Sequence, residues 1–170
     1  MVLSKKTILV EGSSDELIVQ KAFVDKNGKL PIEDSIDVIS VGTSFLRFLE
    51  IAERIQKPIA VVTDNDGNVQ ALRKKYEHYL ADTYTGAVKL CFDENEGKGT
   101  IENFNYNTLE PNIVKSNGWE KMNAVLDAKC QSEEELHKFM KNHKTECALR
   151  IFNTSEPINF PQYILDAITD

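Results

Sequence analysis

Residues 8–15 read Ile-Leu-Val-Glu-Gly-Ser-Ser-Asp, and residues 60–67 read Ala-Val-Val-Thr-Asp-Asn-Asp-Gly. Each stretch is a short apolar run that ends in a pair of carboxylates. Continuous apolar runs of this length are typical of strands that are buried on both faces of a parallel sheet. Carboxylates gathered at strand ends repel one another and raise one another's pKa. A bound divalent cation would remove that cost.

The segments around these two stretches alternate between strand and helix patterns. Strands are expected at residues 7–10, 36–41, 58–63 and 87–92, and helices at residues 14–24, 44–55, 69–80 and 161–168. Ser14 or Asp15 is expected to cap the first helix, and a capping box is expected from Ser132 to Glu135. The pattern predicts an α/β fold with an about four-stranded, mostly parallel sheet flanked by helices and a helical C-terminal extension.

The length of 170 residues fits one domain with a sizeable core. Residues 1–95 are expected to form the α/β core, and residues 96–170 a helical extension that packs on the same domain. The three cysteines form no CxxC pair, so free thiols in a reducing cytoplasm are expected. The absence of a secretory or membrane-spanning apolar stretch also predicts a cytoplasmic, soluble protein.

The net charge of −7 argues by itself against nucleic acid as a partner, because binding phosphates normally takes a basic surface. The objection weakens if part of the acid belongs to a cation site, since a bound metal inverts the local electrostatics. Lysines also cluster at several places in the chain, although a solvated helix face explains such clusters as well.

The position of the carboxylates predicts a site. Glu11 and Asp15 follow the first strand, and Asp64 and Asp66 follow the third. Ligands of an open parallel sheet bind beyond the carboxyl ends of its strands, so the two pairs meet if these strands are neighbours. Such oxygen ligands suit magnesium or manganese rather than zinc. Taken alone, residues 64–67 are better explained as a solvated turn, for which Asn, Asp and Gly are the expected residues.

Joined together, the two stretches resemble the motif pair of Toprim domains. That pair is a Glu after the first strand with an Asp four positions on, and Asp-x-Asp after the third strand. The Val-Glu-Gly, Ile-Ser-Val-Gly and Val-Thr-Asp-x-Asp-Gly strings are similar to those of the overcoming-lysogenization-defect (OLD) nucleases. The resemblance covers residues 7–67 and becomes thinner afterwards. It implies a Toprim fold and metal-dependent hydrolysis of phosphodiester bonds.

The resemblance also implies roles for individual residues. The expected catalytic residues are Glu11, Asp64, Asp66 and Lys144, and the expected ligands of Mg²⁺ or Mn²⁺ are Glu11, Asp15, Asp64, Asp66 and Glu110. Glu110 and Lys144 each have a plainer explanation. Glu110 suits the first turn of a helix, where the dipole favours an acid, and Lys144 is equally well explained as a surface lysine.

The resemblance implies a nucleic-acid substrate, most readily DNA, while an RNA-processing Toprim nuclease and a silent cation-binding or protein-interaction module remain alternatives. OLD-type proteins resemble two-part machines with an ABC-type ATPase ahead of the Toprim domain. Residues 97–100 read Gly-Lys-Gly-Thr but lack the earlier glycine of a P-loop. The ATPase is therefore expected as a domain or subunit outside this chain, which is either an excised nuclease domain or a stand-alone version. The oligomeric state stays open.

Overall fold

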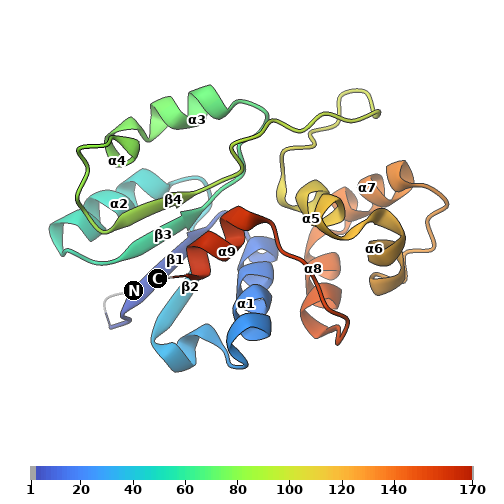
Figure 1. The fold of residues 1–170 in the computed structure, drawn as a ribbon, viewed down its shortest axis with the longest axis horizontal. Coiled ribbons are helices and arrows are strands. Elements are labelled where there is room, and N and C mark those ends of the chain that lie inside the picture. Colours follow the sequence, from blue (N-terminus) through green and yellow to red (C-terminus); the bar gives the residue numbers. More distant parts are fainter. Residues whose placement is uncertain (1–2, 170) are drawn as a thin grey trace.

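The computed structural model describes residues 3–169. Within them, four strands form one parallel sheet in the order β2-β1-β3-β4 (Figure 1). The strands are β1 (Lys6–Val10), β2 (Ile36–Ser40), β3 (Ile59–Val62) and β4 (Val88–Cys91). Because β1 pairs with β3, with Thr7 opposite Ile59, the two carboxylate-bearing strand ends lie at the same edge of the sheet. The expected α/β fold is confirmed.

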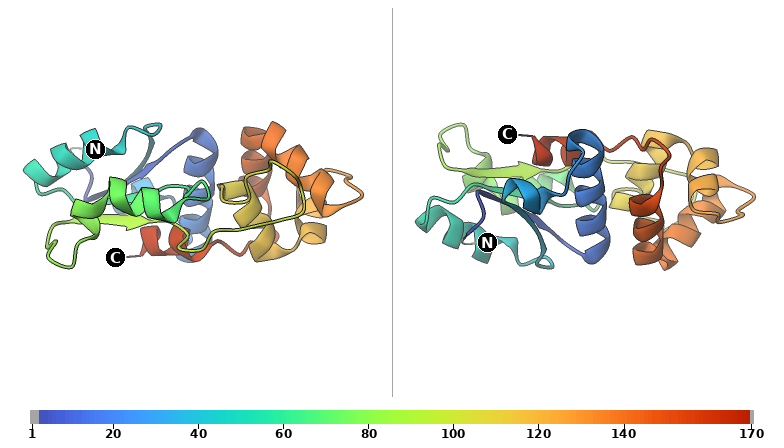
Figure 2. Two further views of the ribbon diagram at one scale, coloured as in Figure 1. Left: turned by 90° about the horizontal axis from the view of Figure 1, so that it is seen from above. Right: turned by 90° about the horizontal axis from the view of Figure 1, so that it is seen from below.

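The helices occupy three regions around this sheet. They are α1 (Ser13–Asn27), α2 (Phe45–Arg54), α3 (Val69–Lys75), α4 (Glu77–Leu80), α5 (Leu109–Asn117), α6 (Trp119–Val125), α7 (Glu133–Asn142), α8 (Lys144–Asn153) and α9 (Gln162–Ile168), with a 3₁₀ turn at Pro31–Asp34. Helices α1 and α9 pack on one face of the sheet, and α2 and α4 pack on the other (Figure 2). Helices α5 to α8 gather beyond α1, on the side toward which the strands run (Figure 1).

The strands are apolar throughout because both faces of the sheet are covered. Ile8 and Val10 face a core cluster that includes α1 and the C-terminal helices, whereas Leu9 faces a second cluster with α2. In β3, Ala60 belongs to the first cluster and Val61 to the second. This alternation follows from the two-residue period of a strand. Because both faces of β1 and β3 are covered, polar side chains reach solvent at the ends of these strands.

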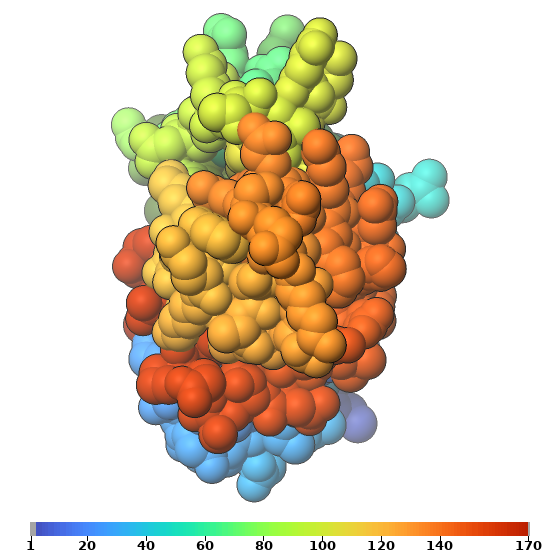
Figure 3. Space-filling model, turned by 90° about the vertical axis from the view of Figure 1, so that its right-hand side faces the viewer, coloured from blue at the N-terminus to red at the C-terminus, as the bar shows by residue number. Residues whose placement is uncertain are grey.

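The helical extension shares its core with the sheet. Leu136 of α7, Ile151 of α8 and Ile164 of α9 belong to the same apolar cluster as Ile8 and Ile18. Helix α8 packs along α1, and α6 and α7 form the outer end of the molecule (Figure 3). The long loop of residues 93–107 runs from the sheet to this end (Figure 1). The extension is therefore placed beside the carboxyl edge of the sheet.

Two of the expected helices differ in their boundaries. Helix α1 continues to Asn27, because Gly28 takes the left-handed conformation, φ +72°, that ends it. Its N-cap is Gly12 rather than Ser14 or Asp15, and Asp15 instead accepts a hydrogen bond from the Gly12 backbone N–H. The helix expected at residues 69–80 is broken into α3 and α4 at Tyr76, whose side chain is fully buried.

Other local expectations hold. Ser132 caps α7 by accepting a hydrogen bond from the Glu135 N–H, although the Glu135 carboxylate accepts from Gln131 rather than from Ser132. All three cysteines are free thiols, with Cys91 and Cys147 buried. In the part of the chain that the structure describes, no helix combines the length and apolar character needed to cross a membrane.

The second core cluster can be tested on α2. Leu49 is fully buried, whereas Ile51 on the same helix is 49% exposed. We expect Leu49→Ala to lower the free energy of unfolding by about 2–5 kcal/mol, because it leaves a cavity under the sheet. Ile51→Ala is the matched control and should change it by less than about 0.5 kcal/mol. Urea denaturation followed by circular dichroism measures both, and equal losses would contradict this assignment of the core.

Candidate active site

One pocket of about 390 Å³ lies where β1 and β3 end, and we call it the carboxylate pocket. Four acids line it, namely Glu11, Asp15, Asp64 and Glu110. The ammonium-bearing Lys144 lines it too. These residues come from the end of β1, the first turn of α1, the end of β3, the first turn of α5 and the start of α8. The fold therefore brings together five of the six residues predicted from sequence.

Glu11 joins the two strand ends. Its Oε1 atom accepts a hydrogen bond from the Thr63 hydroxyl at 2.6 Å and from the Asp64 backbone N–H at 3.3 Å. Thr63 is buried, and its hydroxyl lies closer to Glu11 than to its other acceptor, the Asp64 carbonyl oxygen at 3.3 Å. The role of Thr63 was missed in the sequence, where it appeared only as the last residue of an apolar run. A hydroxyl directly before the first Asp of the Asp-x-Asp motif is the signal that could have identified it.

Asp15 is held at the start of α1, where its Oδ2 atom lies 3.0 Å from the Gly12 nitrogen. The pKa of Asp15 is raised to about 6, chiefly by burial. The bond from Gly12 opposes this increase, and the charges of Glu110 and Glu11 contribute to it. The carboxyl group thus carries a proton under mildly acidic conditions at which an ordinary aspartate is ionised.

Asp64 is the most strongly perturbed acid of the pocket. Burial raises its pKa well above the ordinary value, and the charges of Asp15, Glu11, Glu110 and Asp66 add to this in that order. No group in residues 3–169 donates a hydrogen bond to its carboxylate, whereas Glu11, Asp15 and Glu110 each have a donor. An acid in this position needs either a proton or a bound cation to offset its charge.

Asp66 lies apart from the other acids. Its side chain is exposed and outside the lining of the carboxylate pocket, and its carboxylate accepts a hydrogen bond from Asn105 at 3.0 Å. Asp66 and Gly67 both have positive φ, +50° and +76°, so the segment is the tight turn that its composition indicates. The segment therefore contributes to both a site and a turn: Asp64, just after β3, lines the pocket, and Asp66 belongs to the turn.

Asn65, between the two aspartates, is a further structural residue that the sequence reading missed. Its buried side-chain amide donates to the carbonyl oxygens of Asp93 at 2.7 Å and Asn95 at 3.0 Å, and its oxygen accepts from the Gly67 N–H. These bonds tie the loop after β4 to the turn after β3. Since the partner carbonyls lie about thirty residues away, no local pattern indicates them.

Glu110 and Lys144 form an ion pair between α5 and α8, with 3.1 Å between Nζ and Oε2. Glu110 is buried in the first turn of α5, as the dipole argument expects, and Lys144 is half-exposed. Burial lowers the pKa of Lys144, but the charges of Glu110, Asp64 and Asp15 outweigh it, and the pKa is raised overall. Lys144 is therefore a cation beside the acids, and more than an ordinary surface lysine.

The donor chemistry of the pocket fits a hard divalent cation, since it is composed of carboxylate oxygens. As the side chains stand, no group of three acidic, His or Cys side chains among the described residues is arranged to hold an ion. Glu11, Asp15 and Glu110 each turn toward a protein donor instead. Each of these bonds engages one carboxylate oxygen, so binding an ion would require the other oxygens to come closer together.

Comparison with known proteins agrees with the motif pair. Residues 2–66 match the family model described as overcoming lysogenization defect protein-like, TOPRIM domain. The resemblance to OLD-type Toprim domains is confirmed. No curated protein matches the chain closely enough to count as a relative. An OLD-like Toprim domain implies a nuclease-type or metal-binding role.

Solved structures extend the likeness of fold beyond the Toprim segment. The C-terminal region of the Xanthomonas campestris pv. campestris OLD protein, in its platinum-phased structure, superposes with a TM-score of 0.67 at 19% identity, covering 98% of this chain and 91% of that one. The C-terminal region of the Burkholderia pseudomallei OLD protein gives 0.68 at 18% identity, covering 97% and 95%. The shared fold thus includes the helical extension.

The raised pKa of Asp15 gives the metal-free protein a defined pH dependence. Between the unfolded pKa of 3.8 and the folded value of about 6, the native state holds a proton that the unfolded chain has lost. The contribution of the protonated Asp15 to the free energy of unfolding is therefore fully present below pH 3.8. It is lost as the pH rises through about 6. The shift corresponds to a loss on the order of 2–3 kcal/mol.

Asp15→Asn should flatten this dependence, because the amide cannot ionise yet still accepts from Gly12. We expect the variant to be more stable than the unmodified protein at pH 7.5 in EDTA, measured by urea denaturation at several pH values. Asp82→Asn, at an exposed acid outside the pocket, serves as control. An Asp15→Asn curve with the slope of the unmodified protein would rule out Asp15 as the source.

Proposed function

We propose that this protein is a metal-dependent nuclease that hydrolyses phosphodiester bonds of DNA. The observation that carries the proposal is the carboxylate pocket, where buried acids with raised pKa values lie beside a lysine at the carboxyl edge of a Toprim sheet. A cluster of this kind is unfavourable unless a cation offsets its charge. Perturbed acids in a pocket are also a common mark of a catalytic site.

The proposed ligands of Mg²⁺ or Mn²⁺ are the acids of the pocket and its rim: Glu11, Asp15, Asp64, Asp66 and Glu110. Asp64 supports the assignment most strongly, because its carboxylate has no donor within the described residues. Glu11 contacts the Asp64 backbone and so stands next to it. Asp15 and Glu110 add charge from the opposite wall, and Asp66 would approach from the turn after β3.

When bound, the cation supplies the Lewis acidity that activates water at neutral pH and offsets the charge on a leaving oxygen. The protein side chains have separate tasks. Thr63 fixes the orientation of Glu11, and the bond from Gly12 fixes that of Asp15. Lys144, held by Glu110, presents a positive charge that would stabilise the additional negative charge on the reacting phosphate.

The proposal extends to the organisation of the chain. Residues 1–95 and residues 96–170 would act as one domain, which is supported by the apolar cluster that they share. The likeness to C-terminal regions of OLD proteins supports an ABC-type ATPase domain or subunit as a partner. Glu110 and Lys144, which complete the carboxylate pocket, come from the helical extension, so the extension belongs to the proposed active site.

Nuclease activity is tested by incubation with supercoiled plasmid in Mg²⁺ or Mn²⁺. We expect the unmodified protein to nick the plasmid, and Asp64→Asn to reduce the rate by at least about 100-fold, because it removes a charge required to hold the cation. Lys144→Ala should also reduce it strongly, and Asp82→Asn should not. Gel electrophoresis measures the rates. Absence of nicking by the unmodified protein, or equal nicking by Asp64→Asn, contradicts the proposal, and cleavage of RNA alone would reassign the substrate.

Cation binding is tested separately by isothermal titration calorimetry with Mn²⁺ at pH 7.5. Glu11→Gln is expected to weaken binding about 10- to 100-fold, a typical cost of disturbing a metal site, and Asp82→Asn should leave it unchanged. Circular dichroism confirms that the variants fold. Unchanged affinity in Glu11→Gln would exclude Glu11 as a ligand. Mn²⁺ binding without any nicking would instead support the silent cation-binding module.

A further inference from the structure

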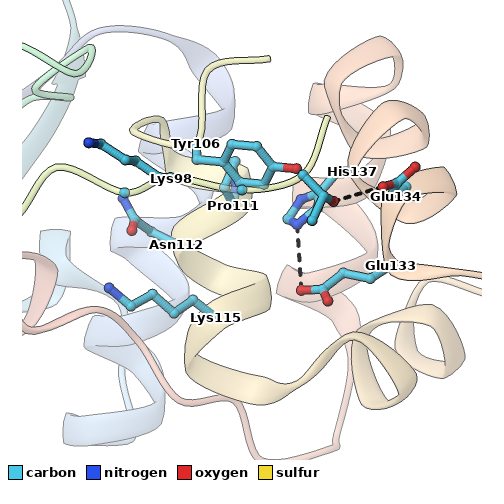
Figure 4. A pocket seen from close by; sticks show the side chains of 11 residues that line it. Lys98, Tyr106, Pro111, Asn112, Lys115, Glu133, Glu134 and His137 are labelled. Carbon is cyan, nitrogen blue, oxygen red and sulfur yellow. Dashed lines mark hydrogen bonds and ion pairs between the residues drawn. The ribbon is translucent and has the colours of Figure 1, made fainter. Parts of the chain in front are cut away.

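A second pocket lies on the other side of α5 from the carboxylate pocket, and we call it the α5 pocket. Its volume is about 400 Å³, within the range of small-molecule sites. One wall is formed by the loop at residues 97–100, another by α5 and a third by α7. Figure 4 shows its side chains. The motif at residues 97–100, which fails as a P-loop, thus lines a cavity nevertheless.

Two lysines of the α5 pocket have no partner. Lys98 comes from the loop and Lys115 from α5, and neither forms a hydrogen bond or an ion pair with any group in residues 3–169. Their side chains extend to the same side of the pocket, with Asn112 between them (Figure 4). Glu133 and Glu134 also line this pocket, but Glu133 faces His137 and Glu134 accepts from Thr100. The two lysines therefore give their own side of the cavity positive charge in a chain with a net charge of −7.

The opposite wall is aromatic. Tyr106 and His137 lie edge to face with 5.2 Å between ring centroids, and both line the pocket. His137 is 4% exposed, and burial lowers its pKa although Glu133 opposes the shift, so the ring is neutral. Its Nδ1 atom is buried and has no hydrogen-bond partner within residues 3–169. A neutral aromatic wall of this kind, with its two rings nearly perpendicular, offers a ring surface that a planar group can contact.

The loop is shaped to leave this wall in place. A Cβ atom on Gly99 would come within 2.0 Å of the Tyr106 ring, so only glycine lets the backbone lie there. The Tyr106 hydroxyl also accepts a hydrogen bond from the Ile101 N–H. Glu134 accepts from Thr100, which ties the loop to α7. The pocket is therefore formed by packing among the loop at residues 97–100, α5 and α7.

We propose that the α5 pocket binds one nucleotide of the nucleic acid strand that the carboxylate pocket cleaves. The phosphate lies between Lys98 and Lys115, and the base lies against Tyr106 and His137. Two lysines alone would bind any anion. Lysines that face an aromatic wall match a nucleotide, because a nucleotide carries its charge at one end and its planar ring at the other. The inference rests on the proposed nuclease function for the identity of the ligand.

Helix α5 links the two pockets. Glu110 of its first turn lines the carboxylate pocket, and Asn112 and Lys115 line the α5 pocket. The loop that bears Lys98 is tied to the turn after β3 through the bond from Asn105 to Asp66. A strand whose scissile phosphate sits among the acids would thus have another of its nucleotides held by the lysines. This arrangement places positive charge next to an acidic site that would otherwise repel the backbone.

The test is an NMR titration of the full chain with deoxyadenosine 5′-monophosphate in EDTA, so that no metal contributes. Saturable shifts are expected for backbone amides of residues 97–100, 106, 112 and 115. Lys98→Ala and Lys115→Ala should each weaken the affinity about tenfold, a typical effect of losing one charge-assisted contact. Lys74→Ala, at an exposed lysine outside the pocket, is the matched control. Gly99→Ala should weaken binding by displacing the Tyr106 ring.

Several outcomes overturn the inference. These are the absence of saturable shifts, shifts confined to the carboxylate pocket, and unchanged affinity in both lysine variants. Inorganic phosphate binding as tightly as the nucleotide would exclude the aromatic contact. The nuclease proposal fails independently, through plasmid nicking, and Asp64→Asn should bind the nucleotide as the unmodified protein does. Nicking by a protein that does not bind the nucleotide would leave the nuclease intact and remove only this pocket.

Discussion

The cost of desolvating partly buried carboxylates that also repel one another is the constraint on which the rest of this site depends. Two parallel neighbouring strands deliver Glu11 and Asp64 to one edge of the sheet, and burial there raises the pKa of Asp64 well above its ordinary value. The protein offsets part of this cost with its own donors, from Thr63 to Glu11 and from Gly12 to Asp15. The remaining charge favours a proton or a cation, which is why the site is a candidate metal centre.

The helical extension supplies what the sheet cannot. Glu110 and Lys144 lie far along the chain from the strand ends, yet α5 and α8 bring them to the carboxylate pocket as an ion pair. The same packing creates the α5 pocket, in which Lys98 and Lys115 form no ion pair with any group in residues 3–169. An acidic protein can thus present positive charge to a phosphodiester backbone locally, because what a ligand meets is the local charge and not the net charge.

Much of the fold was readable from the sequence because its signals are local. The apolar run before Glu11 follows from a strand buried on both faces, and the run before Asp64 does so too. Boundaries were less readable, since tertiary packing sets them. The break between α3 and α4 occurs at Tyr76, whose ring is buried in the core cluster that includes residues of α2. The helical pattern of the sequence does not indicate this break.

The sequence by itself determined the two strand-end motifs, the parallel α/β architecture and the residue types that face the carboxyl edge. Only the tertiary structure decided that Glu110 pairs with Lys144, that Asn65 ties the loop after β4 to the turn after β3, and that Asp66 lies outside the pocket. The physical reason is range. Apolar periodicity and turn chemistry act over a few residues, whereas these contacts join segments about thirty residues apart or more and exist only once the core has formed.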